Sequence, residues 1–275
     1  MAHARVRLIR TGTIPMPRGY VYRGEASSRL ASLGLRAPAS EMIDSPVGAA
    51  LIEHPSAGPV LVDTGMQTDN RLGPVVGVIF RGLRIGPDEN VPARLREWGI
   101  ALEDVGTVVM THLHADHTTA MDRFPNARFV IAREEWAAGR SRLGARKGYV
   151  AGHLPDESAV ELVDFERDGA PHEGLARTID LLGDGSIRLV STLGHSPGHL
   201  SVLVETADGP VFLLGDAVYT RRNLDEDLLP LLTESDSAAR RTMAELRAYA
   251  AAHPGVPLVP THDARAWDEL EPVLS

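Results

Sequence analysis

The stretch from Thr111 to His117 reads THLHADH, and four of its side chains can bind a metal ion. It follows the apolar run Val105 to Met110, which has the length and composition of a buried strand. Side chains two residues apart at a strand end can point to the same side, while the next residues follow on the loop. Imidazole and carboxylate groups are suitable ligands for zinc and related divalent ions. The candidate ligands in this stretch are His112, His114, Asp116 and His117.

Three later segments repeat the pattern of a strand whose end carries a candidate ligand. They read GHSPGH at 194–199, LLGDAVY at 213–219 and LVPTHD at 258–263. In α/β proteins the ligands of a site gather at strand ends, so side chains that are distant in the sequence can converge there. The four segments together predict one metal centre rather than four unrelated polar loops.

Composition limits the classes of protein that the chain can belong to. Its 275 residues, of which 43% are hydrophobic and 24% charged, suit a soluble globular protein with one large domain and a full core, or with two small domains. The absence of cysteine excludes disulfides, thiolate nucleophiles and cysteine-ligated zinc. A net charge of -9 argues against nucleic acid as a partner, because such binding needs clustered Lys and Arg.

The chain shows no sign of membrane insertion. Arginines interrupt the apolar residues at the N-terminus, which argues against a secretory signal, and no run approaches the roughly 20 apolar residues of a membrane span. We therefore expect a cytoplasmic protein with no membrane partner.

Strand-like and helical segments alternate along the whole chain. This alternation, with no low-complexity linker, predicts a single α/β domain over residues 1–275 with hairpin strands mixed in. The Gly- and Pro-rich segment 66–92 contains the apolar run 75–80 and is expected to be an ordered excursion. The expected strands are 4–10, 47–53, 59–62, 105–110, 128–131, 187–192, 200–205, 210–214 and 257–259, and the expected helices are 91–98, 132–139, one starting at Ser235 or Asp236, and one from Ala264.

The combination of HLHADH, SPGH, GDAVY and THD, with DTG at 63–65 upstream, resembles the metallo-β-lactamase superfamily. The resemblance covers the chain from about Val47 to about Trp267. It implies an α/β fold of the αββα sandwich type, with two mixed sheets packed face to face and helices outside. It also implies two divalent metal ions, the first held by His112, His114 and His199, the second by Asp116, His117 and His262, with Asp216 bridging them.

The resemblance also implies supporting roles for neighbouring residues. Asp63 of DTG would orient a ligand histidine from behind. Of the six histidines outside the ligand set, His195 is close enough to a ligand segment to support it, and the others are expected to be ordinary surface or core residues. The ions are expected to be zinc, although sites of this type also accept manganese, iron, cobalt and nickel.

The motifs are most similar to those of the N-acyl homoserine lactonases. In that group a tyrosine in the position of Tyr219 reaches the substrate carbonyl. The similarity implies a hydrolase that opens a lactone or related ester by attack of a metal-bridging hydroxide, with Tyr219 polarising the carbonyl and Asp116 relaying a proton. One departure is the run Thr118 to Ala120, where that group commonly has a Gly-rich turn, and it predicts a differently shaped pocket floor.

Other interpretations stay open at this point. A phosphodiesterase or nuclease, or a thioesterase similar to glyoxalase II, would use the same ligand set, and a non-enzymatic scaffold is the third alternative. A group of apolar and aromatic residues could line an acyl-chain channel, belong to the core, or form the contact of a homodimer. These residues are Met16, Tyr20, Val78, Ile79 and Phe80.

Overall fold

The computed structural model describes residues 3–270 and 273–274. The expected domain also includes residues 1–2, 271–272 and 275, which lie outside this description. Within the described residues, no helix combines the length and the apolar character needed to cross a bilayer.

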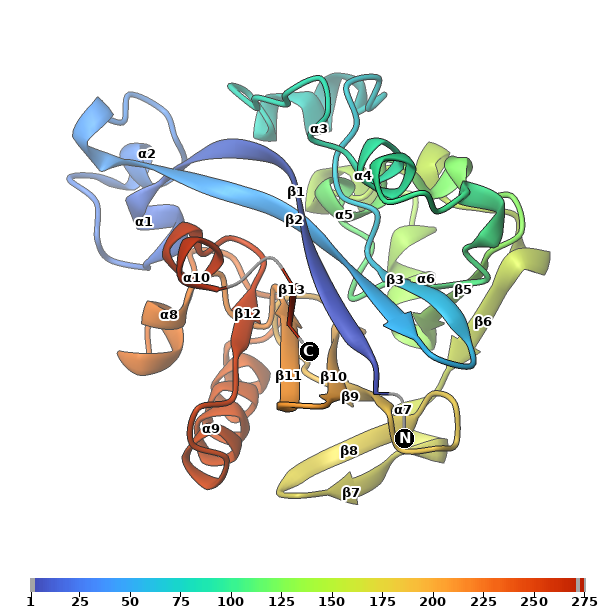
Figure 1. Ribbon diagram of the computed structural model, residues 1–275. Helices are drawn as coiled ribbons and strands as arrows, with labels where there is room; N and C mark the ends of the chain where they lie inside the picture. The colour runs from blue at the N-terminus through green and yellow to red at the C-terminus, as the bar shows by residue number, and fades with distance from the viewer. Residues whose placement is uncertain (1–2, 271–272, 275) are drawn as a thin grey trace.

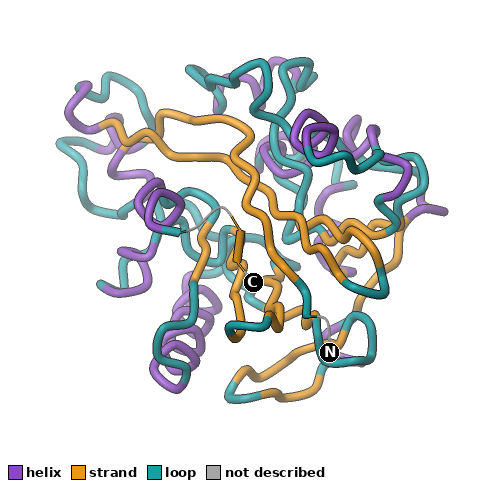
Figure 2. Tube along the Cα trace, in the orientation of Figure 1, coloured by secondary structure: helices purple, strands orange, loops and turns teal. Residues whose placement is uncertain are grey.

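Two sheets form the centre of the molecule, and helices surround them (Figures 1 and 2). The seven-stranded sheet has the order β13-β1-β2-β3-β4-β5-β6, and the six-stranded sheet has the order β12-β11-β10-β9-β8-β7. Strands β3 to β6 pair in parallel, as do β11 and β12, whereas the other pairs are antiparallel. The strands are β1 (Arg5–Pro17), β2 (Met42–His54), β3 (Gly58–Val62), β4 (Thr107–Val109), β5 (Arg128–Ala132), β6 (Val160–Val163), β7 (Ala170–His172), β8 (Leu175–Asp180), β9 (Ile187–Ser191), β10 (Leu200–Thr206), β11 (Gly209–Gly215), β12 (Leu258–Pro260) and β13 (Val273–Leu274).

Helices lie on the outer faces of both sheets. In Figure 1, α4, α5 and α6 lie on one side of the molecule and α9 on the other. The helices are α1 (Arg18–Val21), α2 (Arg29–Ser32), α3 (Gly73–Ile79), α4 (Val91–Glu97), α5 (Ala115–Thr118), α6 (Arg133–Gly139), α7 (Phe165–Asp168), α8 (Arg221–Asp225), α9 (Asp236–Ala252) and α10 (Ala264–Glu269).

Side chains alternate between the two faces of each sheet, and this alternation produces the layers of the fold. On β2, Ile52 packs between the two sheets, whereas its neighbour Leu51 packs under α4. On β10, Val202 faces the space between the sheets, and Leu203 faces α9. Because successive side chains of a strand point to opposite faces, each sheet buries one apolar face against its partner and the other against helices. The arrangement is the expected αββα sandwich.

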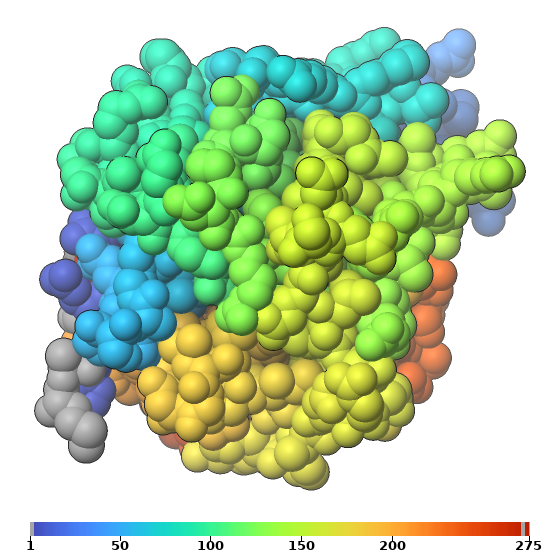
Figure 3. All heavy atoms as spheres, turned by 90° about the vertical axis from the view of Figure 1, so that its right-hand side faces the viewer, coloured from blue at the N-terminus to red at the C-terminus, as the bar shows by residue number. Residues whose placement is uncertain are grey.

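The expected elements of the sequence are present, but β1 extends beyond the expected residue 10 to Pro17 and β2 begins at Met42 instead of Val47, whereas the other boundaries shift by a few residues. The predicted hairpin is β2 and β3, and helix α9 begins after Ser235, whose side chain accepts a hydrogen bond from the backbone of Ala238. Strands β6, β7, β8 and the two-residue β13 were not expected. The exposed and half-buried residues of β6, β7 and β8 lack a clear apolar alternation. In the face shown in Figure 3, the green segments of the first half and the yellow segments around β6 to β8 lie directly against each other.

Four of the five residues with three alternatives separate into two groups, and the fifth, Tyr20, is half-buried against the cluster that contains Tyr219. Met16 and Phe80 are buried in one cluster with Tyr219, so the core interpretation is confirmed for them. Val78 and Ile79 on α3 are 62% and 50% exposed, so the core interpretation is wrong for them. Segment 66–92 is the ordered excursion that its composition predicts, with α3 in its middle.

Candidate metal centre

Strand ends from both sheets deliver the candidate ligands to one place. Asp63 follows β3, the HLHADH segment follows β4 and runs into α5, the 194–199 loop joins β9 to β10, and the remaining two ligands follow β11 and β12. Gly215 at the end of β11 has φ +57, and a Cβ there would lie 3.0 Å from Nε2 of His199 and from Thr111. A side chain at this position would therefore push apart the segments that form the site.

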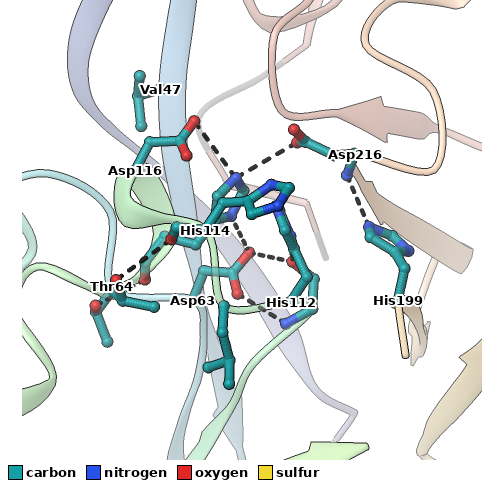
Figure 4. A network of polar contacts seen from close by, with 12 residues as sticks. Val47, Asp63, Thr64, His112, His114, Asp116, His199 and Asp216 are labelled. Carbon is teal, nitrogen blue, oxygen red and sulfur yellow. Dashed lines mark hydrogen bonds and ion pairs between the residues drawn. The ribbon is translucent and has the colours of Figure 1, made fainter. Parts of the chain in front are cut away.

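One group of four buried ligands has its donor atoms within 4.8 Å of one another. Nε2 of His262 lies 3.1 Å from Oδ2 of Asp216 and 3.4 Å from Oδ2 of Asp116. Nε2 of His117 lies 3.4 Å from Oδ1 of Asp216 and 3.7 Å from Asp116. Figure 4 shows the carboxylates of Asp116 and Asp216 directed toward the same central point from opposite sides. The group matches the expected second ion together with the bridging residue.

Hydrogen bonds on the far side of each ring decide which nitrogen carries the proton. Nδ1 of His117 donates to Oδ2 of Asp63 at 2.8 Å, and Nδ1 of His262 donates to the carbonyl oxygen of Pro46 at 2.8 Å. In the neutral form of each ring, Nε2 then presents a lone pair to the carboxylates. Nε2 of His117 and Oδ1 of Asp216 are buried and have no hydrogen-bond partner. With His117 neutral, lone pairs of these two atoms face each other in a buried site, and a divalent metal ion between them would satisfy both.

The charged side chains of this group shift one another's pKa values. Burial alone would lower the pKa of His117, but the carboxylates of Asp63, Asp116 and Asp216 raise it well above its ordinary value. Burial alone would raise the pKa of Asp216, but His262 and His117 hold it well below its ordinary value. The site therefore keeps its carboxylate charged and attracts positive charge, as a metal centre does.

The other group contains three histidines, His112, His114 and His195. It is called the first group here, and the four buried ligands above are called the second group, after the ions that most of their members were expected to hold. Nε2 of His195 lies 3.2 Å from Nε2 of His112 and 2.9 Å from Nδ1 of His114. Oγ1 of Thr111 donates to Asp63 and is 3.1 Å from Nδ1 of His112, which leaves the lone pair of His112 on Nε2. Burial holds the pKa of His112 and of His195 well below the ordinary value, so both rings are neutral ligand types. His195, expected only to support a ligand, lies within this group.

His199 was expected in this group but makes different contacts. Its Nδ1 is 2.8 Å from Oγ1 of Thr192, which is 2.8 Å from Oγ of Ser201, and Ser201 donates to the carbonyl oxygen of Leu214. This chain makes Nδ1 the donor and leaves the lone pair on Nε2, which accepts from the backbone N–H of Asp216 at 3.0 Å (Figure 4). Burial lowers the pKa of His199 to about 3. The ring therefore has the tautomer that a metal ligand needs, and its ring centroid is 5.3 Å from that of His112.

Tyr219 lies beside both groups of ligands. Its ring centroid is 5.3 Å from that of His262 and 5.5 Å from that of His195, and the side chain is buried. Burial, Tyr20 and the carboxylates of the site raise the pKa of Tyr219 well above its ordinary value. The hydroxyl therefore keeps its proton and can donate a hydrogen bond. Tyr20 stacks against it, with ring centroids 6.2 Å apart.

The run Thr118 to Ala120 closes the site from behind. Thr118 and Thr119 are buried, and Oγ1 of Thr119 donates to the carbonyl oxygen of Gly65 at 2.9 Å. Oγ1 of Thr118 is 2.9 Å from Nδ1 of His153. These hydroxyls tie the segment after the ligands to neighbouring loops.

Sequence reasoning missed Glu135 on α6. This carboxylate is fully buried and bonds the backbone of two ligand segments. The only signal for it was an acidic residue inside a segment with buried neighbours such as Trp136, which is weak because acidic residues near helix starts are common.

Comparison with known proteins identifies the family of the chain. The model of the metallo-beta-lactamase superfamily matches residues 44–262. The N-acyl homoserine lactonase AttM of Azorhizobium caulinodans is 35% identical over 238 residues, which cover 82% of this chain and 85% of that protein. The N-acyl homoserine lactonase AttM of Rhizobium radiobacter is 33% identical over 234 residues, covering 81% and 83% of the two chains.

Solved structures share the fold at lower identity. An N-acyl homoserine lactone hydrolase with the product N-hexanoyl-L-homoserine bound at its catalytic metal centre superposes with a TM-score of 0.77 at 20% identity, covering 98% of both chains. AidC, a dizinc quorum-quenching lactonase in complex with a product, gives a TM-score of 0.67 at 15% identity, covering 96% of this chain and 89% of that chain. From the family match and the identity to its relatives, we conclude that the chain belongs to the metallo-β-lactamase superfamily.

Proposed function

We propose that the protein is a metal-dependent hydrolase that opens the ring of a lactone, with N-acyl homoserine lactones as the first substrate class to test. The central observation is the pair of buried, unpartnered atoms on His117 and Asp216, in a group whose His262 ring has its centroid 5.3 Å from that of the donor Tyr219. Relatives that align over four fifths of the chain are N-acyl homoserine lactonases, which supports this substrate class over the alternatives.

The proposed ligand set follows the two groups of side chains. The second ion would be held by Asp116, His117 and His262, with Asp216 shared between the ions. The first would be held by His112 and His114 with an imidazole of the 194–199 loop. We assign this third ligand to His199, whose Nε2 has its lone pair free of a ring proton, and note that His195 lies nearer to the other two. Zinc is the proposed metal, because imidazole and carboxylate ligands suit it.

A simple comparison separates the two candidates for the third ligand. If His199 is the ligand, His199→Ala binds one zinc ion per chain at micromolar free zinc, whereas His195→Ala still binds two. The reverse result would assign the position to His195. Metal content is measured by elemental analysis after dialysis against buffered zinc.

The roles of the chain's own residues in ring opening follow from their placement. Bound divalent ions would supply an activated water at neutral pH and polarise the carbonyl. The hydroxyl of Tyr219 would donate a hydrogen bond to the carbonyl oxygen as negative charge develops there. Asp116, at the edge of the second group, would pass a proton to the alkoxide that leaves when the ring opens. Asp116 and Tyr219 are both buried, which limits their contact with bulk water.

A pH-stat screen with protein of known metal content tests the proposal. The substrates are N-acyl homoserine lactones of several chain lengths, γ-lactones without the acyl amide, aryl esters, thioesters and a phosphodiester. We expect the acyl lactones to give the highest kcat/KM and the metal-free protein to be inactive. A higher kcat/KM for bis-p-nitrophenyl phosphate or for a thioester would assign the protein to another branch of the family.

Three further expectations belong to this proposal. We expect the whole chain to form one domain. Limited proteolysis tests this expectation, and a single domain should give no stable smaller fragment. The exposed Val78 and Ile79 suit either an acyl chain or a second subunit. A change of KM with acyl-chain length in Val78→Ser would favour the acyl chain, whereas a dimer in light scattering that Val78→Ser dissociates would favour the subunit contact. A cytoplasmic location is tested by cell fractionation.

A further inference from the structure

Glu135 is a buried charge with no cation as its partner. The side chain is fully buried, and all the hydrogen bonds that it accepts come from neutral groups. Within residues 3–270 and 273–274, it forms no ion pair with Arg or Lys. Burial of a lone carboxylate is costly unless hydrogen bonds and nearby positive charge compensate it. The hydrogen bonds are present, and a metal ion bound by the neighbouring histidines would supply the positive charge.

The carboxylate connects two ligand segments that are far apart in the sequence. Its Oε1 accepts from the backbone N–H of Leu113 at 3.0 Å. Its Oε2 accepts from the backbone N–H of Gly198 at 3.0 Å and from Oγ of Ser196 at 2.6 Å. Leu113 lies between the two histidines of HLH, and Ser196 and Gly198 lie between His195 and His199. A shift of Glu135 would therefore move both segments that carry the first group of ligands.

Close packing makes this link rigid. A Cβ at Gly198 would lie 2.4 Å from the backbone N of Glu135 and 2.7 Å from its Cβ, so the loop can approach α6 only because this residue is glycine. The ring of Tyr149 packs against His114, with centroids 4.8 Å apart, and Glu135 together with burial raises the pKa of Tyr149. Burial lowers the pKa of His114, and the negative charge of Glu135 opposes this shift. The charge of Glu135 therefore acts on the ring of His114, a member of the first group.

We propose that Glu135 is a positioning residue for the first metal ion, holding the HLH segment and the 194–199 loop together and supplying negative charge behind their histidines. The inference rests on the proposed function, because it assumes that the His112–His114 group binds metal. It assigns to Glu135 a larger effect on the first ion than on the second. Among the described residues, Glu135 forms hydrogen bonds to the segments of the first ion and no hydrogen bond or ion pair with Asp116, His117 or His262. Groups that orient metal ligands typically change metal affinity by about 10- to 100-fold.

Four variants separate the effect of the charge of Glu135 on metal binding from the effect of its shape. Glu135→Gln keeps the size of the side chain but removes the charge and puts an amide N–H₂ in front of one of the backbone donors. Glu135→Asp keeps the charge but is shorter by one methylene. Ser196→Ala removes one hydrogen bond and leaves the carboxylate intact. Glu134→Gln is the matched control, because Glu134 precedes it on the same helix and is exposed.

Cobalt titration of the metal-free proteins measures the stepwise affinities, with the visible absorption of Co²⁺ reporting each ion. We expect Glu135→Gln to weaken one of the two ions by about tenfold or more, Glu135→Asp and Ser196→Ala to weaken it less, and Glu134→Gln to match the wild type. Far-UV circular dichroism confirms that each variant is folded. If Glu135→Gln does not fold, the cobalt affinities of Glu135→Asp and Ser196→Ala are compared with that of the wild type. Equal affinities in these three proteins would overturn the inference.

Other outcomes have distinct meanings. Two ions bound by Glu135→Gln with wild-type affinities, or both weakened equally, overturn the role of Glu135. If Glu135→Asp binds cobalt as weakly as Glu135→Gln, then the shape of the side chain and not its charge determines the affinity, which contradicts the proposed role of the charge. A wild-type protein that binds no cobalt or zinc refutes the proposed function itself, which is thereby distinguished from failure of this inference.

Discussion

Oδ2 of Asp63 accepts a hydrogen bond from Nδ1 of His117 at 2.8 Å, and this bond turns Nε2 of the same ring toward Asp216. Asp63 is held in place by the backbone N–H of Thr111 at 2.8 Å and by the Thr111 hydroxyl at 2.7 Å. Its φ of +61 is unusual for a residue with a side chain. An aspartate that is kept in such a conformation by the surrounding structure, and that orients a ligand ring, is typical of a metal site.

Asp63→Asn should therefore weaken metal binding. An amide can still accept from the Thr111 backbone, but its N–H₂ cannot accept from His117. We expect the affinity for one ion to fall by about 10- to 100-fold in a chelator competition assay. Asp88→Asn is the control, because Asp88 is exposed. Unchanged affinities for both ions would show that Asp63 does not orient the ring.

Tyr219→Phe should slow the chemical step and leave the metal content unchanged. Loss of one donor to a developing oxyanion lowers kcat by about ten- to a thousand-fold. The assay is acyl lactone hydrolysis with elemental analysis of the same sample. Tyr249→Phe is a matched control, because the hydroxyl of Tyr249 is buried without a hydrogen-bond partner in the α9 region. Wild-type turnover in Tyr219→Phe would remove this hydroxyl from the mechanism.

Gly198→Ala should destabilise the protein because the new methyl group would overlap the backbone of Glu135, 2.4 Å from the ideal Cβ. Overpacking of this kind costs about 1–3 kcal/mol in the free energy of unfolding. Gly77→Ala on α3 is the contrasting change, because nothing lies within 4 Å of its Cβ and alanine favours helix. Urea unfolding of the metal-free proteins compares the two. Equal stability of both variants would contradict the close approach of the loop to α6.

The ion pair of Asp236 with Arg23 should make stability depend on pH. Nη2 of Arg23 donates to Oδ1 of Asp236 at 2.8 Å, and hydrogen bonds from Arg23 and Thr233 lower the pKa of Asp236 below its ordinary value of 3.8. A lowered pKa in the folded state means that the stabilisation is present above about pH 3.8 and is lost as the pH falls through the folded pKa.

The difference in Tm between wild type and Asp236→Asn should therefore be largest near pH 7 and narrow below about pH 4. Because both side chains are partly exposed, we expect a difference of about 1–3 °C that decreases in high salt. Thermal unfolding of the metal-free proteins is the measurement. A difference that is constant from pH 7 to pH 3 would contradict the pairing.

Much of the fold and of the candidate site could be predicted from local patterns. The apolar run before THLHADH predicts a buried strand, and a strand end is where ligand side chains can converge. The N-cap Ser235 and the hairpin of β2 and β3 are also local signals. These features depend on residues that are neighbours in the sequence, and their physical causes act over a few residues.

Contacts between distant segments could be decided only by the tertiary structure. No local pattern shows that Glu135 would reach Leu113 and Gly198, that His195 would lie nearer to His112 than expected, or that Val78 would be exposed while Phe80 is buried. Such contacts depend on how the two sheets and α6 pack, which is a property of the whole chain. The sequence by itself therefore determined which side chains are available for a metal centre and at which strand ends they lie, whereas packing decided which of them meet and which buried charge holds them.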